Sequence, residues 1–532
     1  MNGAEHIKRL NELKALRAPF EPFWREAYNY TYPLRGQKFG SDNLPAEAAR
    51  SAAASIQASI YDSTIKDAVR LQVSALVSGL TPANSRWFGC EIFNIDNKEA
   101  EDWLDEAADT VWQNIHASNY DVVAFEAFIE MVVSGMVAIY ITEGALGTGQ
   151  PYNFQQWPLH SVYCADSTGM GLVDTVYRSY MLTAEQAVND FGDEVSEQVT
   201  KAAEKKPDQR FEFVQAIYPR KNAKKLELPI ASDHIEVKGK KVVRESGFHE
   251  MPVVVPRWQV IPDSVYSVGP VDDALPDVKT LNKVVELVLS NADLAIAGMW
   301  GAVDDGVLNP RAVKVGPRKV IPVGHKDSFF PLTSGTKFDI AVLEIDRLQK
   351  SIRKLLMADQ LQPQDGPAMT ATEVHIRTQL VRQLLGPMYG RLQVEFLQPL
   401  VRRCFGLALR AGALGPPPQA LEGKVSVIKY TSPLAKAQKF EDVGAMERFE
   451  GGLFAIAQGV PAALDIYDLD EAIRKKANLL GVPPKLIRDE KEVKTVRETR
   501  AKAMEQAKQQ EQQSKLQEKI APQMMKGDTV NA

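Results

Sequence analysis

Hydrophobic periodicity changes twice along this chain, from helical to strand-like near residue 137 and back to helical near residue 270. Before the first change, apolar residues recur every three or four positions, as in the run from Ile7 to Phe20, which is the spacing of one helix face. Between 137 and 260, short segments rich in β-branched and aromatic residues are separated by Gly, Pro and Asp. They predict an antiparallel sheet with one helix inserted at 182–192. This order predicts an α+β fold.

Helices are expected on both sides of the strand-like region. Before it, apolar residues on one face predict helices at about 7–30, 63–80, 97–118 and 121–135. After it, two long helical patterns at 270–298 and 339–358 flank about 40 residues of strand-and-turn sequence. The chain is therefore expected to carry a small β-containing segment between two long helices.

A polar loop and a charged helix follow the second long helix. The loop at 359–369 contains Gln, Pro, Asp and Gly but no Lys or Arg. Thr370 and Glu373 fit the capping box that begins a helix. After Gly386, Pro387 predicts a kink, because proline cannot donate to the carbonyl four residues back. The helical pattern then resumes to about residue 412.

The C-terminal part has a less regular pattern. A strand is expected at 420–432, followed by several short helices at 433–490 that are broken by Gly-Gly and Pro-Pro pairs. From 485 to 523 the sequence is charged and rich in Gln, without a sustained heptad repeat of apolar residues. This favours a solvated helix or a disordered tail over a coiled coil.

Composition limits the classes of protein to which the chain can belong. It has 532 residues, 45% apolar and 25% charged, which is typical of two to four globular domains or one elongated, multi-lobed chain. The net charge of −5 argues against a protein that binds nucleic acid with its whole surface. Cys90, Cys164 and Cys404 lie far apart without metal-ligand spacing, so neither a zinc site nor a disulfide framework nor another cofactor is expected.

Apolar segments long enough to span a membrane are absent from the sequence. The longest, at 131–142, is shorter than the ~20 residues that a membrane span needs and favours a buried helix or strand. The first residues are charged and amphipathic, which argues against a signal peptide. The chain is expected to be neither secreted nor embedded in a membrane.

The usual catalytic motifs are also absent. The sequence lacks a GxxxxGK[ST] phosphate loop, a Gly-rich dinucleotide fingerprint and GxSxG. The acidic pairs Asp272-Asp273 and Asp304-Asp305 leave open the alternative of a metal-dependent nucleic-acid enzyme. Against it, adjacent acids on a helix point in different directions, and a helix N-terminus favours acids anyway. We therefore expect a protein that is not an enzyme.

Basic residues gather in two places. The first group lies between the two long helices and the second on the charged helix: Lys314, Arg318, Lys319 and Lys326, then Arg377, Arg382, Arg391, Arg402 and Arg403. Two interpretations remain open, a solvated surface and sequence-independent contact with phosphates. Because no segment resembles a base-reading module, sequence-specific DNA recognition is not expected.

Five segments in order along residues 10–410 share the pattern of one known family. The most distinctive is YDSTIKDAVRLQVSALVSGLTPANSRWFGCEI at 61–92, and the others are LRAPFEPFWREAYNYTYP (16–33), ADSTGMGLVDTVYRSYMLTAEQAVNDFG (165–192), VGPVDDALPDVKTLNKVVELVL (268–289) and MTATEVHIRTQLVRQLLGPMYGRLQVEFLQPLVRR (369–403). Together they resemble the portal, or head-to-tail connector, proteins of short-tailed bacteriophages (podovirus type). The run from Tyr266 to Pro270 departs slightly from the family pattern, and the last hundred residues match less clearly.

The resemblance implies a mostly helical, elongated portal fold with an α+β wing, a two-helix stem, a small β-containing clip and a helical crown. On this sequence the implied parts are the wing at 1–269, stem helices at 270–298 and 339–358, the clip at 299–338, a tunnel loop at 359–369, a kinked helix with the wing return at 370–432, the crown at 433–495, and a charged, Gln-rich helical or disordered tail at 496–532.

The resemblance also implies a role and partners. Twelve copies would form a ring at one capsid vertex of the virion, assembled in the cytoplasm of the infected bacterium. Double-stranded DNA would pass through the ring without sequence specificity, driven inward by the terminase large subunit. Capsid and scaffolding proteins and tail adaptor proteins are further implied partners, and no membrane is involved. A different virion adaptor protein remains an alternative.

Particular residues acquire expected roles through the resemblance. The tunnel-loop candidates near DNA are Gln360, Gln362, Gln364 and Asp365, and the clip candidates for docking of terminase or tail are Lys314, Arg318, Lys319 and Lys326. Thr370 and Glu373 would start the helix after the loop, and Gly386-Pro387 would bend it from stem to wing. Most cations on that helix are expected to pair with acids of adjacent subunits, and a minority to face the bore.

Overall fold

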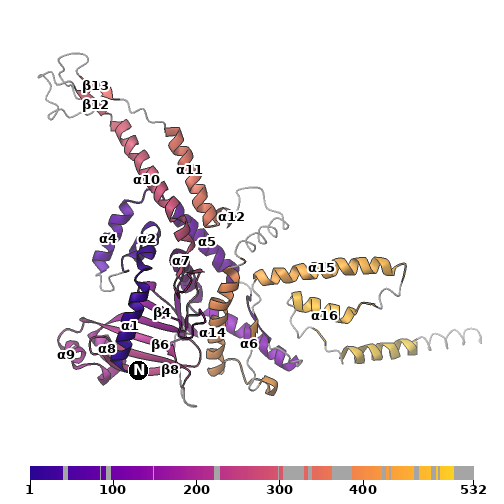
Figure 1. Cartoon of the computed structure of the whole chain (residues 1–532). Coiled ribbons are helices and arrows are strands. Elements are labelled where there is room, and N and C mark those ends of the chain that lie inside the picture. Colours follow the sequence, from indigo (N-terminus) through magenta and orange to yellow (C-terminus); the bar gives the residue numbers. More distant parts are fainter. Residues whose placement is uncertain are drawn as a thin grey trace, which may run out of the picture. The chain divides into compact units, whose positions relative to one another are not determined.

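The computed structural model describes most of the chain and divides it into two compact units. The described residues are 1–39, 46–83, 86–91, 98–145, 147, 149–220, 228–297, 299–302, 329–332, 338–361, 386, 388–421, 427–429, 433–460, 466–480, 487–488 and 492–507. The first unit comprises Met1–Phe93, Leu104–Pro417 and Glu422–Leu434, and the second comprises Asn94–Trp103, Pro418–Leu421 and Ala435–Ala532. Helices and strands are both present in the first unit, which confirms the α+β prediction (Figure 1).

Helices dominate the N-terminal part of the chain. They are α1 (Gly3–Arg17), α2 (Glu21–Thr31), α3 (Pro33–Gly36), α4 (Ala46–Ala58), α5 (Thr64–Leu80), α6 (Lys98–Ala117) and α7 (Tyr120–Ser134). The single helix expected at 7–30 is wrong, because α1 ends before Pro19 and α2 begins beside Pro22. Proline disfavours helical backbone at the residue before it, so the pattern of apolar residues continues across a break in the backbone.

A five-stranded antiparallel sheet lies at the centre of the strand-rich region, in the order β4-β5-β6-β7-β8. Its strands are β4 (Val162–Ala165), β5 (Thr175–Thr183), β6 (Arg210–Pro219), β7 (Ile230–Glu236) and β8 (Lys241–Phe248). Beside it in the chain, β2 (Ala138–Glu143) pairs with β3 (Tyr152–Trp157) and β9 (Val253–Val254). The antiparallel sheet expected between 137 and 260 is therefore confirmed.

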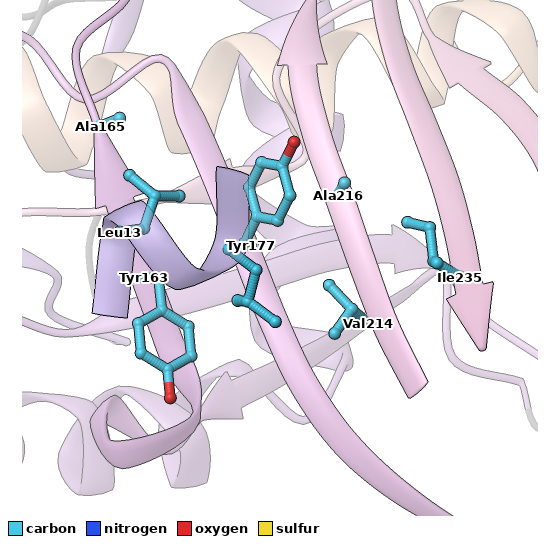
Figure 2. Close-up of a cluster of buried hydrophobic side chains, with 8 residues drawn as sticks. Leu13, Tyr163, Ala165, Tyr177, Val214, Ala216 and Ile235 are labelled. Atoms are coloured by element: carbon cyan, nitrogen blue, oxygen red, sulfur yellow. The ribbon is translucent and has the colours of Figure 1, made fainter. Parts of the chain in front are cut away.

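Helices cover both faces of the five-stranded sheet. On one face, α1 packs its buried leucines against strand residues; the cluster consists of Leu10, Leu13, Tyr163, Ala165, Tyr177, Val214, Ala216 and Ile235 (Figure 2). On the other face, α8 (Ala184–Phe191) and α9 (Glu197–Lys205) pack against Phe211, Phe213 and Val243. Phe213 and Val214 are neighbours on β6 and point to opposite faces, as strand geometry requires. Each fully buried leucine contributes about 1.5–3 kcal/mol.

Arg17 fixes the end of α1 to the sheet. Its side chain is 2% exposed, and its Nη1 donates to the carbonyl oxygens of Leu159, His160 and Val162 at 3.1, 2.8 and 2.8 Å. The guanidinium lies 3.9 Å from the centre of the Tyr163 ring. A buried cation must be compensated by partners of this kind, so α1 has one defined position on the sheet.

Two long helices, α10 (Pro270–Ala297) and α11 (Phe338–Leu355), lie side by side and run antiparallel (Figure 1). Two strands between them in sequence, β12 (Met299–Ala302) and β13 (Phe329–Leu332), form an antiparallel pair. The sequence prediction of two long helices flanking β structure is confirmed for these described residues. A short helix, α12 (Ala358–Leu361), follows α11.

The remaining elements of the first unit are short strands and one irregular helix. β1 (Gly89–Glu91) pairs with β14 (Val427–Lys429), which confirms a strand within 420–432, and β10 (Gln259–Val260) pairs with β11 (Ser267–Val268). Residues 388–392 are helical, Gln393–Leu397 form a π-helical segment, and α14 continues from Gln398 to Arg410. One extra residue per turn in a π segment reorients the following helix.

The second unit contains α15 (Pro433–Ala457), α16 (Leu469–Leu480) and a helical run at 492–507. Gly451 and Gly452 lie inside α15, so the break expected at this Gly-Gly pair is wrong; a helical glycine costs only about 1 kcal/mol. Glu450 accepts from Tyr467 at 2.9 Å and pairs with Lys476 at 2.5 Å. Asp470 pairs with Arg497 at 2.6 Å. The Pro-Pro pair lies outside the described residues.

Candidate functional site

Most of the sequence-predicted site residues lie outside the described residues: Lys314, Arg318, Lys319, Lys326, Gln362, Gln364, Asp365, Thr370, Glu373 and Pro387. Two are described. Gln360 belongs to α12, and Gly386 is an exposed residue in helical conformation. The structure brings none of the candidate residues together within its described part. It does describe the α10–α11 hairpin and the return helix at 388–410, which flank the predicted loop on either side.

The hairpin starts from a close contact between two backbones. Gly135 ends α7 with φ +86°, and a Cβ added there would lie 2.2 Å from the carbonyl carbon of Val268. A Cβ added to Gly269 would lie 2.4 Å from the carbonyl oxygen of Val132. Ser267 Oγ donates to the carbonyl oxygen of Gly135 at 2.6 Å. Only glycine fits at both positions, so the first residue of α10 is held directly against α7.

The acidic pair at the start of α10 has a structural explanation. Burial raises the pKa of Asp272, and the neighbouring Asp273 and Glu26 raise it further. The two acids lie in the first turn, where the helix dipole stabilises negative charge. Among the described residues, no group of three or more His, Cys, Asp or Glu is placed to hold a metal ion. The pair Asp304-Asp305 lies outside the described residues.

The base of the hairpin is packed against α5. α5, α10 and α11 are in mutual contact, and the buried apolar residues here are Val278, Leu281, Leu348, Ile352 and Leu356. Between the two long helices, Ser351 Oγ donates to Asp277 Oδ2 at 2.7 Å. This bond shows which residues of α10 and α11 lie beside each other, at the same distance from the base of the hairpin; such residues are at one level.

The segment at 59–62 ties both long helices to the N-terminal helices. Asn282 on α10 donates to the carbonyl oxygen of Ser59 at 2.9 Å and accepts from the amide of Tyr61 at 2.7 Å. Gln349 on α11 donates to Asp62 Oδ2 at 2.8 Å. The other oxygen, Asp62 Oδ1, accepts from the amide of Thr64, the first residue of α5. One aspartate therefore joins α5 and α11, which gives a physical reason for the Asp-Ser-Thr start of the 61–92 segment.

The return helix is held by a buried ion pair at its π segment. Arg257 Nε donates to Glu395 Oε2 at 2.9 Å, and Arg257 Nη2 donates to Glu395 Oε1 at 2.7 Å. Nη2 also donates to the carbonyl oxygen of Gly171 at 2.6 Å. Arg257 is 2% exposed, and two parallel bonds of this kind fix orientation as well as distance. The pair was not predicted from the sequence, in which its two residues are 138 positions apart.

A second charged cluster holds α14. Glu250 accepts from Arg403 at 3.1 Å and from Arg410 at 2.7 and 2.8 Å. Burial opposes ionisation of Glu250, but hydrogen bonds and charge from Arg410 and Arg403 outweigh it and lower its pKa. The cluster borders an open cavity of about 460 Å³ that Phe248, His249 and Leu407 also line. Arg403 and Arg410 line this cavity together with Glu143, and both arginines already bind Glu250.

Of the five cations expected on the charged helix, Arg391, Arg402 and Arg403 lie within the described residues. Arg403 is buried on Glu250, and Arg391 donates to the carbonyl oxygen of Trp258 at 3.1 Å, so both are used within the chain. Arg402 is exposed. Arg377 and Arg382 lie outside the described residues. Arg391 and Arg403 therefore have partners within the chain, and pairing of cations on this helix with acids of adjacent subunits stays a prediction.

Glu130 is a further buried group that the sequence analysis did not single out. It accepts from the amide of Leu159 at 2.9 Å and from the Tyr28 hydroxyl at 3.3 Å, and it also binds Gln156. Burial raises the pKa of Glu130. Its signal in the sequence is a single acid inside an apolar run on α7. Its contacts connect α2, α7 and the sheet and serve the fold.

Membrane insertion finds no support among the described helices, since none combines the length and apolar character that a membrane span requires. Within the first unit, the described geometry is that of an α+β body with a projection made of α10 and α11. The contacts at its base are hydrogen bonds and ion pairs with fixed partners. This arrangement suits a structural component in which the projection is held in one direction.

Comparison with known proteins identifies the family. Residues 4–487 match the family described as "Bacteriophage head to tail connecting protein". The portal protein of Salmonella phage epsilon15 is 27% identical over 93% of this chain and 90% of its own length. The probable portal protein of Bordetella phage BPP-1 is 25% identical over 94% and 92%. The portal protein of Escherichia phage T7 is 23% identical over 54% and 53%. The chain therefore belongs to the bacteriophage head-to-tail connecting proteins and is a portal protein of the podovirus type.

Proposed function

We propose that twelve copies of this chain form a closed ring at one vertex of the phage head, and that the genome enters and leaves through its centre. The observation that carries the proposal is the family match over residues 4–487, combined with a two-helix projection on a rigid α+β body. A ring with rotational symmetry joins two different faces of each subunit. An elongated subunit with a long hairpin offers such faces.

In this proposal the parts of the chain have separate roles. Residues 1–269 and the return helix form the wing, α10 and α11 form the stem, and 299–338 form the clip. The loop at 359–369 approaches DNA, 433–495 form the crown, and 496–532 are a charged tail. The bond between Ser351 and Asp277 and the contacts of Asp62 support a stem that is rigidly joined to the wing.

The electrostatics favour a channel that does not hold DNA tightly. Each chain carries a formal charge of −5, so twelve copies would carry roughly −60 before local patches are considered. Every phosphate that a protein neutralises adds binding free energy through counterion release. Glutamines such as Gln360 and Gln362 would contact the duplex without that contribution, which lets the polymer slide.

The docking roles concern the two ends of the ring. Lys314, Arg318, Lys319 and Lys326 in the clip would contact the terminase large subunit during packaging and tail adaptor proteins afterwards. Capsid and scaffolding proteins would contact the wing during assembly in the cytoplasm of the infected bacterium. Basic side chains suit such exchangeable contacts, because charges at the rim of an interface mainly raise association rates.

Native mass spectrometry of the purified full chain tests the ring. Twelve copies of the 58.9 kDa chain predict a species of about 707 kDa. Monomers at every concentration would contradict the proposal. A deletion of 362–369 tests the loop separately, since it leaves α12 intact. This variant is expected to form rings but to package or retain less DNA than the wild type, and normal packaging would refute the role of the loop.

A further inference from the structure

The outer half of the α10–α11 hairpin exposes large apolar side chains. Leu287 on α10 is 51% exposed, and Val342 and Leu343 on α11 are 61% and 72% exposed. At the base of the hairpin, α5 covers the apolar residues. Farther out, the described part of the hairpin consists of the helices α10 and α11 (Figure 1). Two helices can bury only the faces that they turn toward each other, so apolar residues on other faces require a partner.

These apolar residues lie at one level of the hairpin. The bond between Asp277 and Ser351 sets the level of the two antiparallel helices, and each helix rises about 1.5 Å per residue. Ten residues outward, Leu287 is therefore level with residue 341, next to Val342 and Leu343. Four residues toward the base, Asp273 on α10 is level with residue 355, which directly follows Lys354.

The two helices also differ in charge. α10 carries five acidic and two basic residues, whereas α11 carries three acidic and four basic residues. Several of these charges are used within one helix, as in the pairs Lys283–Glu286 and Lys350–Asp346. Asp273 and Lys354 are exposed, and within the described part of the chain neither forms an ion pair. The net charge is therefore negative on α10 and positive on α11.

We propose that α10 of one copy packs against α11 of the next copy around the ring, with Leu287 on Val342 and Leu343 and Asp273 near Lys354. This inference rests on the ring proposed above, with the hairpin running along the ring axis. Rotation about that axis keeps every residue at its own height, so only residues at one level can meet. The level of the apolar group and the opposite charges both satisfy this condition.

Disulfide formation between two different single variants tests the contact. Leu287→Cys and Leu343→Cys chains are purified separately, mixed during assembly and oxidised. The three native cysteines are buried, and a mixture of single variants excludes bonds within one chain. We expect disulfide-linked dimers in the mixture and almost none in either variant alone, because a head-to-tail interface brings 287 to 343 and not to itself. A mixture of Val122→Cys and Leu343→Cys is the control, since Val122 on α7 is 73% exposed.

The test separates this contact from the ring itself. Dimers should exceed the control about tenfold, as expected for groups held at high effective concentration. Rings without excess dimers would overturn the proposed contact and leave the ring intact, and they would assign the apolar residues to another partner protein. Absence of rings in the wild type would overturn both. If the cysteine variants fail to assemble, charge-reversal variants test the contact instead. Asp273→Lys and Lys354→Asp should each lower the ring yield about threefold at low salt. The double variant, which carries both substitutions, should restore the ring yield. No restoration would refute the pairing.

Discussion

Replacing Glu395 by Gln is expected to loosen the return helix while the sheet stays folded. The substitution removes the charge that compensates Arg257, whose side chain is 2% exposed. Both bonds from Arg257 to Glu395, at 2.9 and 2.7 Å, end on carboxylate oxygens, and an amide offers only one acceptor. Losing one partner of a buried ion pair costs about 3–5 kcal/mol. Arg257 keeps the carbonyl oxygens of Gly171 and Val265, so we expect about 3 kcal/mol, the lower end of that range.

Amide hydrogen exchange measured by mass spectrometry on the full chain provides the assay. Peptides covering 388–397 and 166–174 should exchange about a hundredfold faster in the Glu395→Gln variant, because local opening free energies set the exchange rate. The matched control is Glu12→Gln on α1, which breaks an exposed pair with Arg9. An exposed pair contributes about 0.5 kcal/mol, so exchange around it should change about twofold.

Two results would refute this reasoning. Equal exchange in the Glu395→Gln and Glu12→Gln variants would mean that the buried pair does not hold the helix. The double variant Arg257→Met with Glu395→Met removes both charges and fills a similar volume, so it should recover most of the lost protection. If it is less protected than Glu395→Gln, the penalty does not come from an uncompensated charge.

Other contacts give three further expectations. Gly269→Ala should destabilise the fold by about 1–3 kcal/mol in thermal unfolding, since the added Cβ would lie 2.4 Å from the carbonyl oxygen of Val132. Gly444→Ala is the control, because open space surrounds Gly444, and it should be neutral or slightly stabilising. Burial lowers the pKa of His234 from 6.5 to about 4. The contribution of neutral His234 to folding stability is therefore complete above pH 6.5 and is lost as the pH falls toward 4. His234→Gln should flatten the acid-unfolding curve between these two pH values. Burial opposes ionisation of Glu250, but pairing with Arg410 and Arg403 lowers the pKa of this carboxyl group. The stabilisation from ionised Glu250 is therefore present above the ordinary carboxyl pKa and is lost as the pH falls through the lowered value. Glu250→Gln should remove this loss of stability in acid and speed amide hydrogen exchange in α14.

Much of the fold could be predicted from local pattern. The helical pattern extends over many residues at 270–298 and 339–358, and the strand pattern does so between 137 and 260. The structure has long helices and strands in these regions. Breaks were harder to predict. Pro19 interrupts an apolar pattern that continues beyond it, and Gly451 and Gly452 do not interrupt α15, because helix continuity depends on packing as well as on propensity.

The contacts that hold the hairpin and the return helix could not be predicted. Arg257 and Glu395 are 138 residues apart in sequence, and Gln349 and Asp62 are 287 apart. A pattern within one segment carries no information about such partners. The candidate DNA-contact and docking residues, apart from Gln360, lie outside the described residues, so their roles stay predictions. The family could be predicted, since five segments in fixed order are a more specific signal than any single motif.

The proposed function requires this chain to close into a ring with an open centre. Electron microscopy of the purified full chain, with averaging of end-on views, tests it most directly. We expect annular particles with twelvefold rotational symmetry and a central opening wide enough for a DNA duplex. Particles that lack rotational symmetry or a central opening, or a protein that stays monomeric at every concentration, would contradict it.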